Sequence, residues 1–173
     1  MTFSPELEAR FENFLAKYPA DRKRSAVIPM LIYGQDETGA ITEELIEEIA
    51  KRTGATVLQV TEVVGFYSML HRKPQGKYHV QVCTNISCLL VGGAELWEQA
   101  CHKLKIGHKE TTKDGLISLE EVECMGACSW APAVQVNYDF YHDVTPEQFD
   151  KLIDGLAAGK KPEEIAEVHK VSC

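Results

Sequence analysis

The sequence lacks several features that would point to common functions. It contains no apolar run long enough to span a bilayer, and its first residues, Met1 to Glu6, are not a basic flank followed by an apolar stretch. The phosphate-binding patterns G-x-G-x-x-G and G-x-x-x-x-G-K-S/T are also absent. We therefore expect no direct membrane insertion, no secretory leader and no nucleotide or flavin site in this chain.

Clustered basic residues are missing as well. The 173 residues include 18 Lys and Arg but 26 Asp and Glu, which gives a formal net charge of −8 at pH 7. Because nucleic acids and anionic membranes are bound by clustered Lys and Arg, we expect neither as the main partner. With 45% hydrophobic and 25% charged residues, the chain has the composition of a globular protein of one ordinary domain or two small ones.

Residues 1–75 are predicted to form an N-terminal helical bundle. Ser4 is placed to cap a first helix, and the apolar segment 25–35 predicts a second. Thr42 is the expected N-cap of a third helix, and residues 56–59 read as the capping box of a fourth. The bundle is therefore expected to contain four helices.

Glycines punctuate this helical half. Gly34 and Gly39 are expected to mark the exit of the second helix. Gly65 falls inside the fourth helix, where glycine costs roughly 1 kcal/mol against alanine. We expect another element to come close at Gly65. The basic, turn-forming segment 71–76 then marks the domain boundary.

Residues 76–160 are predicted to form a domain of strands and helices. The expected elements, in chain order, are a strand at 78–82, a helix at 94–105, a strand at 117–123, a hairpin at 133–144 and a helix that begins after Thr145. The strand–helix–strand order implies a parallel crossover, and the hairpin adds an antiparallel pair. The fold class is α+β: a helical bundle followed by a small mixed sheet with helices on its faces, an order compatible with a thioredoxin-like domain. Residues 161–173 form a C-terminal tail, in which 162–169 predict a last short helix.

Two cysteine pairs are the strongest chemical feature of the sequence. Cys83 and Cys88 have C-x4-C spacing, and Cys124 and Cys128 have C-x3-C spacing. Each pair follows a predicted strand and is expected to lie on a turn. If the two strands are neighbours, both loops share one end of the domain and the four sulfurs can converge. In a reduced compartment such pairs are more often metal ligands than disulfides.

The spacing leaves two kinds of metal site open. A two-iron cluster takes four thiolates, and structural zinc also accepts four. Zinc ribbons favour C-x2-C pairs, which are absent, and the same absence argues against a thioredoxin-type redox site. A Rieske centre would need two histidines, whereas His79 alone precedes the first pair. A [2Fe–2S] cluster and a zinc-stapled interaction module therefore both remain.

The surroundings of the cysteines carry further expectations. Gly126 can adopt a positive φ, which would let the shorter loop turn its amides toward sulfur. Cys101 shares a predicted helix face with Ala94, Trp97 and Leu104, so it is interpreted as a buried core residue. The apolar residues expected to shield the site from water are Ile86, Leu89, Leu90, Met125 and Trp130.

The chain resembles a known family over about residues 5–160. This family is the small thioredoxin-like iron–sulfur subunit of the NADH dehydrogenase module of respiratory complex I, NADH:quinone oxidoreductase, which also serves some NAD-linked hydrogenases and formate dehydrogenases. The matching stretches are Val64 to Tyr67, Gly76 to Cys83 with Cys88, Thr111 to Gly115, Val122 to Cys128 and Ala131 to Asn137.

The resemblance implies a cofactor, partners and a location. It implies one [2Fe–2S] cluster on Cys83, Cys88, Cys124 and Cys128, with no catalytic residue in this chain. It also implies a partner subunit that binds NADH and FMN, whose flavin exchanges single electrons with the cluster, and further iron–sulfur subunits. The expected location is cytoplasmic, at the inner face of the membrane as part of a larger complex. Cys173 is assigned no role.

Overall fold

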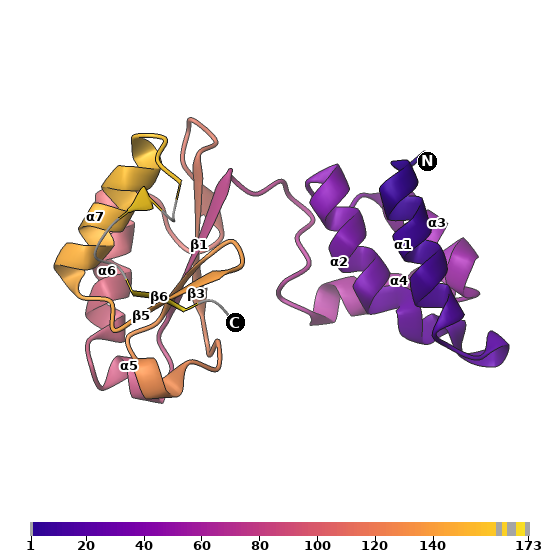
Figure 1. The fold of residues 1–173 in the computed structure, drawn as a ribbon, viewed down its shortest axis with the longest axis horizontal. Helices are drawn as coiled ribbons and strands as arrows, with labels where there is room; N and C mark the ends of the chain where they lie inside the picture. The colour runs from indigo at the N-terminus through magenta and orange to yellow at the C-terminus, as the bar shows by residue number, and fades with distance from the viewer. Residues whose placement is uncertain (1, 162–163, 166–168, 172–173) are drawn as a thin grey trace. The chain divides into compact units, whose positions relative to one another are not determined.

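The chain divides into two compact units, Met1–Pro74 and Gln75–Cys173. The structure is a computed structural model that describes residues 2–161, 164–165 and 169–171 (Figure 1). None of the helices in these described ranges combines the length and the apolar character that crossing a bilayer requires.

The first unit is a bundle of helices around one apolar core. Its elements are α1 (Pro5–Ala16), the 3₁₀ helix η1 (Ala20–Ala26), α2 (Val27–Thr38), α3 (Glu43–Thr53) and α4 (Val57–Phe66) (Figure 1). The side chains of Ser4 and Thr42 accept hydrogen bonds from backbone amides in the first turns of α1 and α3. Both hydrogen bonds of the capping box between Thr56 and Gln59 are present. These caps confirm the predicted starts of the three helices.

The second helix differs from its predicted bounds. It begins at Val27 because Ala20–Ala26 form η1, an element that the sequence pattern does not predict. It continues to Thr38 and ends at Gly39, which adopts the left-handed conformation with φ +76°. Gly39 therefore marks the exit of the helix, as expected, whereas Gly34 lies within it.

The close approach expected at Gly65 is found at Gly34 instead. A Cβ atom added to Gly65 would meet no atom within 4 Å, so that prediction is wrong. A Cβ atom on Gly34 would lie 2.8 Å from Leu45 Cδ1, because α3 packs closely against α2 at this point. Both glycines interrupt apolar helices, and the sequence alone does not show which helix face meets a neighbour.

The second unit is built on a six-stranded mixed sheet with the order β2-β3-β1-β4-β5-β6. The strands are β1 (Tyr78–Cys83), β2 (Glu110–Thr111), β3 (Ile117–Val122), β4 (Val134–Val136), β5 (Asp139–His142) and β6 (His169–Val171). β1 and β3 are parallel, and the other neighbouring strands pair antiparallel. The predicted parallel crossover and the β4–β5 hairpin are confirmed, and the order is that of a thioredoxin-like fold.

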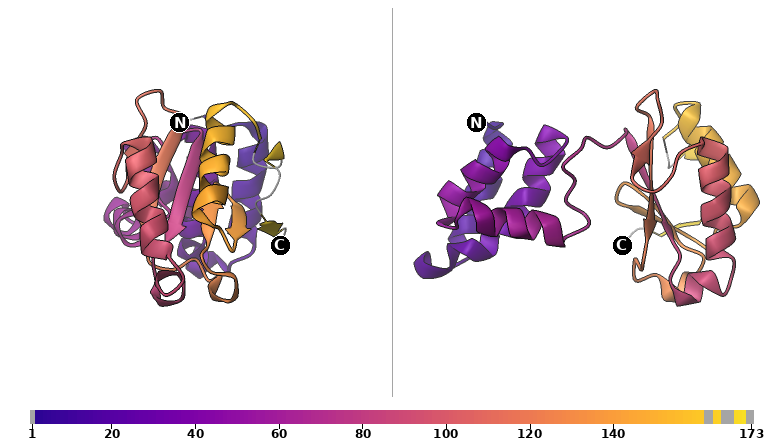
Figure 2. Two further views of the ribbon diagram at one scale, coloured as in Figure 1. Left: turned by 90° about the vertical axis from the view of Figure 1, so that its left-hand side faces the viewer. Right: turned by 180° about the vertical axis from the view of Figure 1, so that it is seen from behind.

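The helices of this unit cover one face of the sheet rather than both. α6 (Gly93–Leu104) and α7 (Pro146–Ala157) lie side by side on the same face, while the short α5 (Ile86–Leu89) lies at one end (Figures 1 and 2). Val80 and Val82 of β1 point into the core on the helical side, together with Leu96 and Phe149. The intervening strand residue Gln81 donates a hydrogen bond to Glu120 of β3. This polar alternation explains why helices pack on only one side.

Two further predictions need correction. The buried face of α6 is formed by Gly93, Leu96 and Ala100, whereas Cys101 and the other residues of the predicted face are only partly buried. The last short helix expected at 162–169 falls mostly outside the described residues, and His169 begins β6. At the other end of α7, Thr145 and Gln148 form the predicted capping box, so the start of that helix is confirmed.

Candidate metal centre

Both cysteine pairs begin at the same edge of the sheet. β1 ends at Cys83, and β3 ends at Val122, shortly before Cys124. The strands are parallel neighbours in which Cys83 lies opposite Val122. The backbone amide of Cys83 also donates to the carbonyl of Ala133, just beyond the second pair. The strands are thus neighbours, as the convergence of the two pairs requires.

The first pair is not carried by a simple turn, as the sequence suggested. Residues Ile86–Leu89 form the short helix α5, and Cys88 lies inside it. Asn85 caps this helix, since its Oδ1 accepts a hydrogen bond from the Ile86 amide at 2.8 Å. Cys83 and Cys88 are both buried. A strand end and a helix turn therefore hold the first two thiols on the inner side of the site.

The second pair lies on a tight loop turned by glycine. Gly126 has φ +81°, and its amide donates to Cys124 Sγ at 3.4 Å. This confirms the expected role of Gly126, because few other residues adopt that conformation without strain. Cys128 begins a 3₁₀ turn, η2 (Cys128–Trp130), and both cysteines of this pair are exposed. The outer side of the site is thus open.

Contacts link the two loops. The Cys83 thiol donates to the carbonyl oxygen of Glu123, with the sulfur and oxygen 3.8 Å apart. Burial raises the pKa of the Cys88 thiol to about 11, and the nearby sulfurs of Cys83 and Cys128 raise it further, although a backbone hydrogen bond at Ala133 lowers it. Cys88 therefore carries a proton at neutral pH, which a metal ion must displace to bind there.

The donor set fits an iron–sulfur cluster. Cys83, Cys88, Cys124 and Cys128 are free thiols, and no disulfide occurs among the described cysteines. Cys83 and Cys88 belong to a small apolar cluster with Ala127 and Ala133, which provides a low-polarity inner wall. The Gly126 amide supplies a hydrogen bond to sulfur of the kind that stabilises thiolate charge. Four thiols in this setting can hold a [2Fe–2S] cluster, and by donor type alone also zinc.

The predicted shield around the site is wrong for most of its members. Met125 is partly buried and packs beside the cysteines. The other expected residues, joined by Val91, instead form an exposed set that we call the apolar rim: Ile86, Leu89, Leu90, Val91 and Trp130. These side chains project from α5, its C-terminal turn and η2 into solvent. An exposed apolar patch beside a candidate metal centre is typical of a docking surface.

The sequence did not single out His142 as part of this region. Its ring stacks on Trp130, with ring centroids 4.7 Å apart and planes inclined by 6°. His142 is buried, while Trp130 is 50% exposed. One face of the Trp130 ring is therefore fixed against β5 and the other part of the ring faces outward. The hairpin and the second cysteine loop are separated in sequence, so only the fold brings them together.

The remaining cysteines lie away from this centre or outside the described residues. Cys101 is on α6, partly buried, and packs against the core between the sheet and the helices. Burial raises the pKa of the Cys101 thiol, and the charge of Glu121 adds to the effect. This supports the interpretation of Cys101 as a packing residue. Cys173 is not among the residues that the structure describes.

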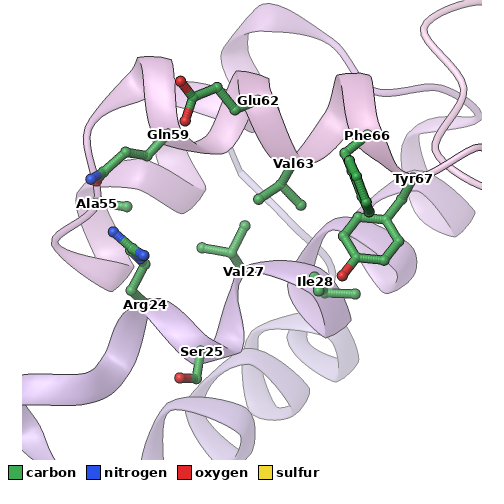
Figure 3. Close-up of a pocket in the computed structure, with 10 residues that line it drawn as sticks. All are labelled: Arg24, Ser25, Val27, Ile28, Ala55, Gln59, Glu62, Val63, Phe66 and Tyr67. Carbon is green, nitrogen blue, oxygen red and sulfur yellow. The ribbon is translucent and has the colours of Figure 1, made fainter.

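A separate cavity of about 420 Å³ lies within the helical unit (Figure 3). Val27 and Val63 line its floor, Arg24 and Gln59 lie at one end, and the aromatic rings of Phe66 and Tyr67 lie at the other. Its lining contains neither cysteine nor histidine. The cavity therefore offers no thiolate or imidazole ligand, and the metal chemistry of the chain is confined to the cysteine loops.

Comparison with known proteins identifies relatives along most of the chain. A family model described as thioredoxin-like [2Fe-2S] ferredoxin matches residues 11–157. NADH-quinone oxidoreductase subunit 2 of Thermus thermophilus is 45% identical over 166 residues, which cover 95% of this chain and 92% of that protein. The corresponding NADH-quinone oxidoreductase protein of Rickettsia typhi is 42% identical over 144 residues, 83% of this chain and 85% of that protein.

A solved structure shares the fold. It is a chain of an NAD+-reducing [NiFe]-hydrogenase in the H2-reduced state, with a TM-score of 0.67 and 17% sequence identity. The similarity covers 79% of this chain and 23% of the hydrogenase chain. At this identity the match supports the arrangement of elements and no particular chemistry.

Proposed function

The chain belongs to the thioredoxin-like [2Fe–2S] ferredoxin family, and on that premise we propose that it is the electron-transfer subunit of an NADH:quinone oxidoreductase. Its relatives are subunits of NADH-quinone oxidoreductases, and the family cofactor is one [2Fe–2S] cluster. The observation that carries the proposal is the convergence of both cysteine pairs on one edge of the β1–β3 pair.

The ligands of the cluster are Cys83, Cys88, Cys124 and Cys128. Two of these thiols are buried and two are exposed, so the cluster is fixed from the inner side and approachable from the outer side. When bound, it accepts and releases single electrons. The Gly126 amide favours the more negative state by donating to Cys124 Sγ.

The electrons come from a partner subunit that binds NADH and FMN. The sequence of this chain contains neither of the phosphate-binding glycine patterns, which supports placing that chemistry on another polypeptide. The apolar rim surrounds the exposed cysteine loop and is the surface we assign to contact with this partner. Electron exchange with FMN follows from that contact, and further iron–sulfur subunits complete the complex.

The location we propose is peripheral, at the inner face of the membrane and within the larger complex. Membrane attachment is assigned to other subunits, since the described helices include no candidate span. The same subunit role in an NAD-linked hydrogenase or formate dehydrogenase is the alternative. The shared fold with an NAD+-reducing hydrogenase favours it, but the curated relatives favour the quinone enzyme.

Reduction by NADH tests this function. The full chain, purified anaerobically, is mixed with its flavin-containing partner and titrated with NADH while the visible absorption of the chain is followed. We expect bleaching that depends on both NADH and the partner. Bleaching by NADH without a flavoprotein, or no bleaching in its presence, would contradict the proposed role. Identification of the subunits that co-purify with the chain decides between quinone, hydrogenase and formate complexes.

A further inference from the structure

Gly93 lies against the backbone of both cysteines of the first pair. It opens α6 and is buried. A Cβ atom built on Gly93 would lie 2.8 Å from the carbonyl oxygen of Cys83 and 2.8 Å from both the carbonyl carbon and oxygen of Cys88. Side chains essentially never come so close to other heavy atoms, so only the hydrogen of glycine fits between α6 and the two cysteines.

The turn between α5 and α6 holds this contact in place. The Val91 amide donates to the Cys88 carbonyl at 3.2 Å, and the Gly92 amide donates to the Leu89 carbonyl at 3.3 Å. Gly92 then adopts φ +98°, which reverses the chain and brings Gly93 back onto Cys88. The carbonyl of Cys88 is thus fixed by the turn on one side and bounded by Gly93 on the other.

The neighbours of Gly93 distinguish it from other tightly packed glycines. At Gly34 and Gly155, an added Cβ atom would meet the ends of side chains, Leu45 and Ile165 respectively. Such side chains can rotate away. At Gly93 the obstacles are backbone atoms of two cysteines, one at the end of a strand and one in a helix. These atoms move only if the two elements move relative to each other.

We propose that Gly93 is the positioning residue of the cysteine site: its lack of a side chain sets the separation between the backbones of Cys83 and Cys88. The inference rests on the proposed ligand set. An alanine at this position displaces Cys83 from Cys88 by a few tenths of an ångström or more, and their sulfur atoms move with them. The electronic signature of the cluster and its retention both depend on that separation.

The test compares Gly93→Ala with two matched glycine variants in the full chain. In Gly76→Ala the Cβ atom also meets backbone, 2.9 Å from the Ser118 amide nitrogen, but at the far end of β1 and β3 from the cysteines. In Gly65→Ala it meets no atom within 4 Å. Each protein is purified anaerobically, and the measurements are the EPR spectrum of the reduced state, the midpoint potential and the rate of cluster loss to a chelator.

We expect Gly93→Ala to change the EPR spectrum and to lose its cluster about tenfold faster than the wild type. Gly76→Ala should lower thermal stability with an unchanged spectrum, and Gly65→Ala should change neither. A Gly93→Ala spectrum and loss rate equal to those of the wild type or of Gly76→Ala would overturn the inference. So would a Gly93→Ala chain that fails to fold even without the cluster, because the displacement would then not be confined to the site. If the wild-type chain itself contains no iron or sulfide, the proposed function fails instead.

Discussion

Cys83 lies opposite Val122 in the parallel pairing of β1 and β3. Because parallel neighbours end at the same edge of a sheet, this register delivers Cys124, just beyond Val122, to the same place as Cys83. The two cysteine pairs are separated by the whole of α6 in the sequence, yet they share one small apolar cluster. The proposed ligand set depends on this relationship more than on the spacing within either pair.

Removal of one ligand should abolish the cluster, while removal of an unrelated thiol should not. We expect Cys124→Ala to lose the visible absorption of the purified protein, because the cluster requires four thiolates. Cys101→Ala is the control, since Cys101 packs on α6 against the core. Absorption spectra of both variants provide the measurement. Loss of the spectrum in Cys101→Ala would mean that the ligand set is misassigned.

The glycine in the second loop should tune the potential of the cluster. Gly126→Ala strains a residue at φ +81° by about 1 kcal/mol and disturbs the amide bond to Cys124 Sγ. We expect a more negative midpoint potential, because a lost hydrogen bond to sulfur disfavours the reduced state. A redox titration followed by EPR measures the shift.

Gly115→Ala is the matched control for that experiment. Gly115 has φ +70° and, like Gly126, open space around its Cβ position, but it precedes β3 at the opposite end from the cysteines. It should carry similar backbone strain with no change in potential. Equal potentials for Gly126→Ala, Gly115→Ala and the wild type would exclude a role for the Gly126 amide.

The apolar rim should be needed for partner binding but not for the cluster. Leu90 is 79% exposed, so Leu90→Glu should change the free energy of unfolding little and leave the visible spectrum intact. We expect it to abolish co-purification with the flavin-containing subunit. Tyr138→Glu serves as control, because Tyr138 is 71% exposed in the β4–β5 turn, outside the rim. Normal co-purification of Leu90→Glu would place the interface elsewhere.

An ion pair in the helical unit should make stability depend on pH. Arg52 donates to the Glu8 carboxylate, with Nη2 and Oε1 2.8 Å apart, and this hydrogen bond lowers the pKa of Glu8 below the ordinary glutamate value of 4.5. A lowered pKa in the folded state means that Glu8 stabilises the fold above pH 4.5 and loses this effect as the pH falls through its folded pKa. Glu8→Gln should therefore destabilise the chain at neutral pH and progressively less in acid.

Urea unfolding of the cluster-free chain, followed by helical circular dichroism, measures that difference. Glu6→Gln is the control, because Glu6 pairs with Arg10 at an exposed position where ion pairs contribute little. A pH-independent difference between Glu8→Gln and the wild type would show that the carboxylate charge is not what Arg52 stabilises.

Local rules predicted the parts of the fold that local interactions determine. The caps at Thr42, Thr56 and Thr145 follow from hydrogen bonds within one helical turn, and each is found in the structure. The alternation in β1 follows from the two faces of a strand. The left-handed conformation of Gly126 follows from the shortness of its loop. In the site, these rules suffice to bring the cysteines to strand ends.

Features that depend on distant neighbours were not predictable in the same way. The helix α5 is too short to show helical periodicity, so Cys88 was placed on a turn. The close approach at Gly34 rather than Gly65 depends on where α3 crosses α2. The contact of Gly93 with two cysteine backbones likewise requires the packing of α6. Leu90 was interpreted as a shield because an apolar sequence does not reveal whether the same chain or a partner covers it.

The most direct test of the central claim is the metal and sulfide content of the full chain purified without oxygen. The account predicts a brown protein with equal amounts of iron and acid-labile sulfide, and visible absorption that bleaches when dithionite is added. A colourless protein that contains zinc and no sulfide would contradict it and identify the four cysteines as a structural zinc site.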